Sequence, residues 1–302
     1  MVITTTDKYG RKITSLRISI TPICNLNCFY CHREGHKYNQ NRFMTPSEIY
    51  KIVEVSTKFG VRKIKISGGE PLLRNDIVDI VKFIHNIEGI KDISLTTNGI
   101  LLKDYAEKLK ENGLNRINVS LDTLNPKKYE EITNSNKLNK VLEGIEKSID
   151  VGLTPVKINY LAMKKTMDDL ENIMEYCKSV GAILQIIELM PLDETLKKEY
   201  VNIDDIEREI QKKSIKTIVR KQMQNRKKYI LEDDLEVEFV RPVDNSEFCN
   251  HCTRLRLTYD GYLKPCLLRD DNLTDVLTPL RNGEDIKKYF LESIDKREPY
   301  YK

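Results

Sequence analysis

The sequence predicts an α/β fold: a partial (β/α)6 TIM-like barrel followed by a smaller α+β C-terminal domain. Up to Met190, six short runs rich in β-branched and apolar residues alternate with amphipathic stretches. Connections of this length indicate parallel strands joined by right-handed crossovers, and six units instead of eight favour a partial barrel. Past about residue 200 the alternation stops. We therefore divide the chain into residues 1–200 and 201–302.

The expected elements of the barrel follow in order. Strands are predicted at 16–21, 63–67, 92–97, 116–122, 155–161 and 184–190. Helices are predicted at 46–59, 76–87, 103–112, 138–151 and 168–180. Thr45, Pro46 and Glu48 are typical of a capped helix start, and four glycines stand where helices should end: Gly60, Gly113, Gly152 and Gly181.

The C-terminal domain is expected to mix the two element types. A charged helix is predicted at 203–212, and strand-like runs follow at 228–231 and 235–240. Residues 254–259 and 262–266 are predicted to form a hairpin that turns at Asp260-Gly261.

Six of the seven cysteines fall into two triplets with metal-site spacing. Cys24, Cys28 and Cys31 form C-x3-C-x2-C. The second triplet, C-x2-C-x13-C, consists of Cys249, Cys252 and Cys266. Three thiolates are one short of a closed four-ligand site, and a [4Fe–4S] cluster held by three thiolates keeps one iron open for chemistry.

Two other interpretations of the triplets are disulfides and structural zinc. Odd clusters suit disulfides poorly, and residues 1–14 contain no apolar segment of a secretory signal. Zinc would need a fourth ligand, which His32 or His36 could supply at the first triplet and His251 at the second. The seventh cysteine, Cys177, lies alone in a helical pattern and is predicted to be structural.

Composition narrows the class of protein. The chain has 302 residues, and 50 basic against 46 acidic residues give a net charge of +4, too balanced for nonspecific nucleic-acid binding. No apolar run reaches the ~18 residues of a membrane span. Reduced thiols at cluster spacing favour the cytoplasm.

Small and polar residues follow several predicted strands. The second ends in Ser67-Gly68-Gly69-Glu70-Pro71, where two glycines let backbone approach a ligand closely. Thr96-Thr97-Asn98-Gly99 ends the third strand, and Ser120-Leu121-Asp122 ends the fourth. The first cysteine loop follows the first strand. In a parallel barrel these ends share the face where chemistry occurs.

The spacing of the first triplet, with Tyr30 before its third cysteine and GGEP downstream, resembles the radical S-adenosylmethionine enzyme family over residues 10–195. The resemblance implies that the open iron chelates S-adenosylmethionine. Its reductive cleavage then gives a 5′-deoxyadenosyl radical that abstracts a substrate hydrogen. Cys24, Cys28 and Cys31 would be catalytic in this sense.

Further motifs narrow the resemblance to one subfamily, the GTP 3′,8-cyclases of molybdenum cofactor biosynthesis. They are LRIS at 16–19, KIKISGGEPLLR at 63–74, TTNG at 96–99, NVSLDTL at 118–124, VKINY at 156–160, and C-x2-C-x-R-x-R closed by Cys266. The subfamily implies two [4Fe–4S] clusters, an electron donor and GTP as substrate, with the second cluster binding GTP through its open iron. The resemblance does not decide between a monomer and a homodimer.

The resemblance also assigns roles to single residues. It implies S-adenosylmethionine contacts from Tyr30, Gly69, Ser120 and Met190. It implies GTP contacts from Arg17, Lys65, Thr96, Lys157, Arg254 and Arg256, the last two also catalytic. Arg254 and Arg256 alternate by two and so share one strand face. A polyphosphate needs such cations, for which Lys63 and Arg74 are weaker candidates.

Three positions depart from the subfamily pattern. The chain ends at 298–302 as EPYYK, without the double glycine of many relatives. Gln185 and Lys65 stand where many relatives carry arginine.

Two competing functions are another two-cluster radical enzyme, such as a peptide maturase, and a zinc-ribbon binding module. The first predicts more C-terminal cysteines, and the second needs four ligands and a basic stripe.

Overall fold

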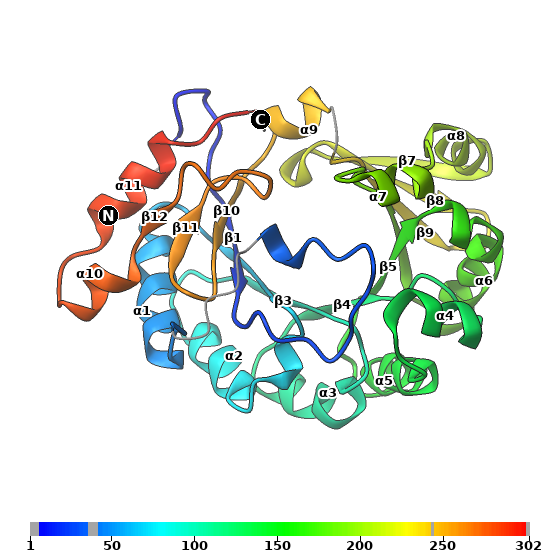
Figure 1. The fold of residues 1–302 in the computed structure, drawn as a ribbon, viewed down its shortest axis with the longest axis horizontal. Coiled ribbons are helices and arrows are strands. Elements are labelled where there is room, and N and C mark those ends of the chain that lie inside the picture. Colours follow the sequence, from blue (N-terminus) through cyan, green and yellow to red (C-terminus); the bar gives the residue numbers. More distant parts are fainter. Residues whose placement is uncertain (1–5, 36–41, 243–244, 300–302) are drawn as a thin grey trace.

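A computed structural model describes residues 6–35, 42–242 and 245–299 (Figure 1). They form a twelve-stranded sheet in the order β12-β11-β10-β1-β2-β3-β4-β5-β6-β9-β8-β7. Its central strands are β1 (Ser15–Ser19), β2 (Lys63–Ser67), β3 (Asp92–Thr97), β4 (Arg116–Ser120), β5 (Val156–Ala162) and β6 (Ile183–Glu188). Each is parallel to its neighbours. The predicted six-strand barrel core is confirmed.

Helices cover the outside of this curved sheet, as Figure 1 shows. They are α1 (Pro46–Thr57), α2 (Ile77–His85), α3 (Leu102–Glu111), α4 (Pro126–Thr133), α5 (Leu138–Asp150) and α6 (Leu170–Val180). The capping box at Thr45 and Glu48 is formed as predicted. Isoleucine, leucine and valine side chains of the strands pack against these helices and form one large core.

The chain beyond β6 continues the same sheet at both of its edges. On one side, β9 (Glu236–Val240) runs parallel to β6, and β8 (Arg226–Leu231) and β7 (Ser214–Arg220) follow antiparallel. On the other side, β10 (Arg254–Leu257) runs parallel to β1. The hairpin partner β11 (Tyr262–Lys264) and β12 (Thr274–Asp275) complete that flank. The division at residue 200 stays a prediction, but the sheet runs across it.

The remaining helices lie in the C-terminal third. They are α7 (Glu194–Glu199), α8 (Asp204–Lys212), α9 (Ser246–Asn250), α10 (Leu277–Arg281) and α11 (Lys287–Asp295). The predicted helix at 203–212 is thus confirmed as α8. Within the described ranges no helix has the length and apolar character needed to cross a bilayer.

Candidate active site

A cavity of about 480 Å³ opens on the concave side of the sheet. All six cysteines of the two triplets line it. So does every other residue predicted for the site: Arg17, Tyr30, Lys65, Gly69, Thr96, Ser120, Lys157, Met190, Arg254 and Arg256. Arg74 is not among the lining residues and instead forms an ion pair with Asp76. Cys177 is buried in α6, as its structural role predicts.

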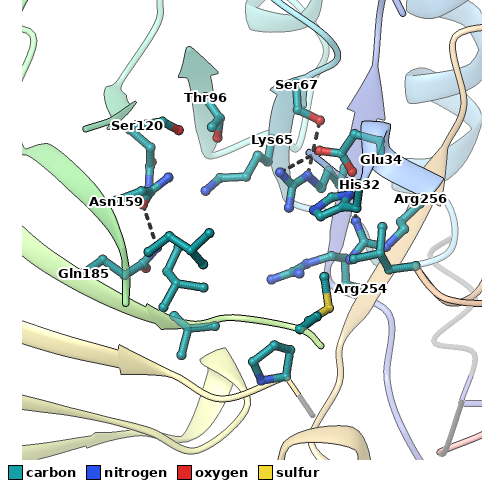
Figure 2. Close-up of a pocket in the computed structure, with 18 of the residues that line it drawn as sticks. His32, Glu34, Lys65, Ser67, Thr96, Ser120, Asn159, Gln185, Arg254 and Arg256 are labelled. Atoms are coloured by element: carbon teal, nitrogen blue, oxygen red, sulfur yellow. Dashed lines mark hydrogen bonds and ion pairs between the residues drawn. The ribbon is translucent and has the colours of Figure 1, made fainter. Parts of the chain in front are cut away.

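Strand register explains why these side chains meet. Arg17 lies opposite Arg256 of β10 on one side and Lys65 of β2 on the other. Farther along, Ser120 of β4 is level with Asn159 of β5, which is level with Gln185 of β6. Neighbouring side chains in register share one face of a sheet, so the strands build rows of polar groups across the cavity wall. Figure 2 shows Lys65 and Arg254 reaching into the cavity, across from Gln185 and Asn159.

The first cysteine loop follows β1 and is held by its neighbours. The backbone N–H of Leu26 donates to Cys24 Sγ at 3.4 Å, and Asn98 Nδ2 lies 3.9 Å from the same sulfur. The Tyr30 hydroxyl donates to Asp122 at 2.5 Å. Burial, followed by the nearby Asp122 carboxylate, raises the pKa of Cys28 to about 12. A thiol in this environment becomes an anion only with a strong positive partner such as a metal centre.

The glycines after β2 leave room for that loop. A Cβ on Gly69 would meet the Ile23 carbonyl oxygen at 2.3 Å, and the Gly69 N–H donates to the Thr21 carbonyl at 2.7 Å. The next residue, Glu70, is buried and accepts from the Thr97 hydroxyl and the Asn98 N–H, both at 2.7 Å. Burial raises the pKa of Glu70 to about 7. These contacts tie the ends of β2 and β3 to the cysteine loop.

Cys249 of the second triplet lies in α9, and Cys252 and Cys266 flank the β10–β11 hairpin. Burial raises the pKa of Cys249 to about 11. Burial also opposes ionisation of Cys252, but Arg297, Arg254 and Arg11 outweigh it and lower its pKa. The two cysteine segments thus provide thiols that have hydrogen-bond donors and cations beside their sulfurs. These surroundings fit iron–sulfur clusters, which are anionic when bound by thiolates.

The cysteine triplets were also compared with sites that hold a single metal ion. Among residues 6–35, 42–242 and 245–299, no three or more His, Cys, Asp or Glu side chains form a group set to hold one metal ion. Thiolates of a cubane cluster bind different irons, so this result bears only on mononuclear sites such as zinc. Of the histidines considered as zinc ligands, His32 lines the cavity and His251 does not, whereas His36 lies outside the described residues.

Cations crowd the space between the two triplets. Burial, and then the guanidinium groups of Arg17 and Arg254, hold the pKa of Lys65 well below its usual value. Burial and neighbouring cations also lower the pKa of Arg254 and of Arg256 to about 10. Mutual repulsion of this kind disappears when a polyanion enters. The cavity therefore suits a ligand with several negative charges.

One buried acid lies among these cations. Glu34 follows the first triplet and is 9% exposed. Its carboxylate contacts Arg17 Nη2 at 2.8 Å and Arg256 Nη1 at 3.4 Å (Figure 2). Glu34 thus holds two of the predicted GTP contacts in place. Sequence reasoning missed it, because a single acid in a loop gives no signal without the register that brings β10 beside β1.

Sequence reasoning also missed Arg226, at the start of β8. It lines the cavity, is 9% exposed and donates to the Gln185 side-chain oxygen at 3.0 Å. Burial lowers its pKa to about 10. A guanidinium is therefore present beside Gln185, the position where the sequence alone indicated a missing cation. The basic run around it, 226–228, was the available signal.

Lys157 is placed differently from the other predicted contacts. Its Nζ lies 2.5 Å from Glu238 Oε1, and both side chains are buried. Burial lowers the pKa of Lys157 to about 8, against the attraction of Glu238. The same carboxylate also contacts Arg220 and lies 3.7 Å from Lys228 Nζ. Glu238 thus gathers cations from β5, β7 and β8.

Comparison with known proteins identifies the family. The family model described as the radical SAM superfamily matches residues 18–177. The chain belongs to the radical SAM superfamily. The family model described as Molybdenum Cofactor Synthesis C matches residues 182–302, which contain the second triplet. The resemblance seen in the cysteine spacing and the GGEP motif is thereby confirmed.

Curated relatives in this superfamily match almost the whole chain. A protein of Methanocaldococcus jannaschii named probable GTP 3′,8-cyclase is 66% identical over 296 residues, which cover 98% of this chain and 99% of that protein. A protein of Methanococcus aeolicus with the same name is 63% identical over 298 residues, with the same coverage. A third, from Methanothermobacter thermautotrophicus, is 47% identical over 302 residues, 98% of each chain.

Two solved structures share the fold. SuiB of Streptococcus suis bound to S-adenosylmethionine matches with a TM-score of 0.71 at 18% identity, covering 94% of this chain and 67% of that chain. SuiB bound to its precursor peptide SuiA matches with a TM-score of 0.67 at 19% identity, covering 86% of this chain and 61% of that one. At these identities the likeness concerns the fold.

Proposed function

We propose that this chain is a GTP 3′,8-cyclase, the S-adenosylmethionine-dependent radical enzyme of the first step of molybdenum cofactor biosynthesis. The observation that carries the proposal is the single cavity lined by both cysteine triplets, with buried cations between them. Near-full-length relatives bear this name. The substrate GTP would become (8S)-3′,8-cyclo-7,8-dihydroguanosine 5′-triphosphate.

Each triplet would hold one [4Fe–4S] cluster. Cys24, Cys28 and Cys31 would hold the first cluster, which would supply, with S-adenosylmethionine, the radical that removes the C3′ hydrogen of GTP. Tyr30, Gly69, Ser120 and Met190 would contact S-adenosylmethionine. Cys249, Cys252 and Cys266 would hold the second cluster, which would bind GTP through an iron without a cysteine ligand.

The cations would orient the nucleotide between the clusters. Arg17, Lys65 and Arg256 form one row across β1, β2 and β10, where they can bind the triphosphate. Thr96 Oγ1 is buried without a hydrogen-bond partner within the described structure and is available to a ligand. Holding C3′ near the radical source and near C8 removes orientational freedom worth several kcal/mol, about 7–11 in favourable cases.

Arg254 opens β10, the strand that begins just after Cys252. Its pKa stays high enough, at about 10, for the guanidinium to remain charged at neutral pH. We assign Arg254 and Arg256 the catalytic task of stabilising charge on the guanine and phosphates as the C3′–C8 bond forms. Lys157 would join them once a phosphate competes with Glu238 for its ammonium group.

The reaction consumes electrons, so the enzyme needs a low-potential one-electron donor. Its oxygen-sensitive clusters and reduced thiols favour the cytoplasm. A homodimer is also proposed, and light scattering of the purified protein would test it.

The test is an anaerobic assay of the iron–sulfur-reconstituted protein with dithionite, S-adenosylmethionine and GTP. Mass spectrometry follows 5′-deoxyadenosine and the cyclised nucleotide. We expect both to appear together, and substitution of GTP by ATP to abolish the second. 5′-Deoxyadenosine without a nucleotide product would refute GTP as the substrate and favour another radical reaction. Absence of both, with about eight irons per chain present, would refute the radical enzyme altogether.

A further inference from the structure

A buried charge cluster lies behind the second cysteine triplet, formed by Asp7, Arg11 and Arg297. The Asp7 carboxylate contacts Arg11 Nε at 2.8 Å and Arg297 Nη1 at 3.0 Å. Side-chain exposure is 0% for Asp7, 5% for Arg11 and 1% for Arg297. Residues from both ends of the described chain therefore meet here, close to α9 (Figure 1).

Both guanidinium groups contact the backbone that carries the cysteines. Arg11 Nη1 donates to the Cys249 carbonyl at 3.0 Å, and Arg297 Nη2 donates to the Cys252 carbonyl at 2.5 Å. Arg297 also contacts the Arg11 carbonyl at 3.3 Å, which fixes the two arginines relative to each other. The cluster thus positions two of the three thiols from behind.

The charges in this cluster do not balance. Two arginines share one carboxylate, which leaves one positive charge in a buried place. In addition, Arg11 Nη2 and Arg297 Nε are buried and have no hydrogen-bond partner within the described structure. A buried cation and unpaired N–H donors are costly unless an anion lies beside them.

The group expected at the second triplet supplies that anion. A [4Fe–4S]²⁺ core bound by three thiolates carries one net negative charge, and its sulfurs accept hydrogen bonds. Zinc bound by the same three thiolates would carry the same charge, but it has no potential that could be tuned. The surplus charge of the arginines matches the charge of the oxidised cluster and favours the more negative reduced form.

We propose that Arg11 and Arg297, held by Asp7, are positioning residues that set the reduction potential of the second cluster. This inference rests on the proposed presence of that cluster, and it goes beyond the proposed activity. Positive charge and hydrogen bonds near cluster sulfurs raise the potential, because they stabilise the form with the extra electron. The N-terminal segment thus acts on the opposite end of the chain.

The test uses the full-length protein with Cys24, Cys28 and Cys31 replaced by alanine, so that only the second triplet can bind a cluster. After reconstitution, a redox titration followed by electron paramagnetic resonance gives its midpoint potential without substrate. We expect Arg297→Gln to make the potential more negative and Asp7→Asn to make it more positive. Arg297→Lys keeps the charge and should lie between Arg297→Gln and the parent.

Arg281→Gln is the matched control, because this arginine is half-exposed and pairs with Glu48 on the outside of the fold. It should leave the potential unchanged. If Asp7→Asn and Arg297→Gln retain about four irons and both keep the parent potential, the inference is wrong, whatever the activity. If Arg297→Gln loses its iron, the midpoint potential of Asp7→Asn alone tests the inference: an upward shift supports it, and an unchanged potential contradicts it. Absence of iron in the parent would instead overturn the second cluster itself, and with it this inference.

Discussion

At the scale of single residues, the crowding of cations in the cavity should couple substrate binding to protonation of its lysines. The pKa of Lys65 is held low by burial and by Arg17 and Arg254, and that of Lys157 is about 8. A bound triphosphate favours the charged lysines and raises both pKa values. The protein should therefore take up protons as GTP binds, and its affinity for GTP should fall as the pH rises.

Calorimetric titration of GTP into the reconstituted protein, without S-adenosylmethionine or reductant, measures this uptake in buffers of different ionisation enthalpy. We expect net uptake near pH 8 in the unsubstituted protein, because the pKa of Lys157 is about 8. Lys157→Arg should bind GTP with less uptake and a weaker pH dependence, since guanidinium stays protonated. Equal uptake in both proteins would show that Lys157 does not change its charge on binding.

A second prediction at this scale concerns Gly69 and the iron content of the protein. A Cβ there would meet the carbonyl oxygen of Ile23 at 2.3 Å, directly before Cys24. Gly69→Ala should displace the first cysteine loop and lower bound iron from about eight toward about four per chain. Gly152→Ala is the control: no atom lies within 4 Å of its added Cβ, and its φ of +68° strains only the local backbone, away from the cysteine loop. Full iron content in Gly69→Ala would show that the loop adapts without loss.

At the scale of elements, Glu238 of β9 joins β5, β7 and β8 through buried ion pairs. Glu238→Gln leaves Lys157 and Arg220 without their counter-ion and should lower the free energy of unfolding by about 3–5 kcal/mol. Glu236→Gln, on the same strand, removes a partly exposed partner of Lys228 and should cost roughly 0–1 kcal/mol. Denaturant unfolding at pH 7 compares the two. Equal losses would contradict a special role of Glu238.

The ion pairs of Glu238 also predict that the free energy of unfolding falls at acidic pH. Although burial opposes ionisation, Lys157 and Arg220 lower the pKa of Glu238 to about 2, below the unfolded value near 4.5. A carboxylate with a lowered pKa stabilises the fold fully above the unfolded value, and this contribution is lost as the pH falls toward 2. The unfolding free energy of Glu238→Gln should therefore depend less on pH between about 4.5 and 2 than that of the unsubstituted protein.

The elements show how far sequence reasoning reaches. Runs rich in β-branched and apolar residues predicted β2 and β3 with their observed bounds, and capping signals predicted α1. The helix α4 was missed, although Asn125 caps it and Pro126 opens it, because it is short and polar. The strand β7 was missed for a different reason: most of its side chains are exposed at the sheet edge, so no burial pattern marks it.

The site divides in the same way. Residues that belong to compact motifs, such as the cysteine triplets and GGEP, could be found because their chemistry depends on spacing along the chain. Glu34 could not, and only the basic run 226–228 marked Arg226, because the positions of both depend on which strands become neighbours. The pairing of β1 with β10, and of β6 with β9, brings distant residues into the cavity.

At the scale of the whole molecule, the C-terminal third supplies both flanks of one sheet. A fragment of residues 1–200 would expose the edges of β1 and β6 and would lack the cations of β8 and β10. We expect it to show no cooperative thermal transition by circular dichroism. The matched control is the full chain with the second triplet changed to serine, which keeps every strand and should unfold cooperatively. A cooperative transition in the fragment would establish residues 1–200 as an independent domain.

The pairing of β1 with β10 also has a consequence for the order of synthesis. Strand β1 is among the first segments to leave the ribosome, yet the strand that covers its outer edge is made only in the last fifth of the chain. Contacts between such distant segments form slowly, because the intervening chain must be ordered first. The first cysteine loop is therefore complete and open to iron delivery well before the wall that holds the second triplet exists.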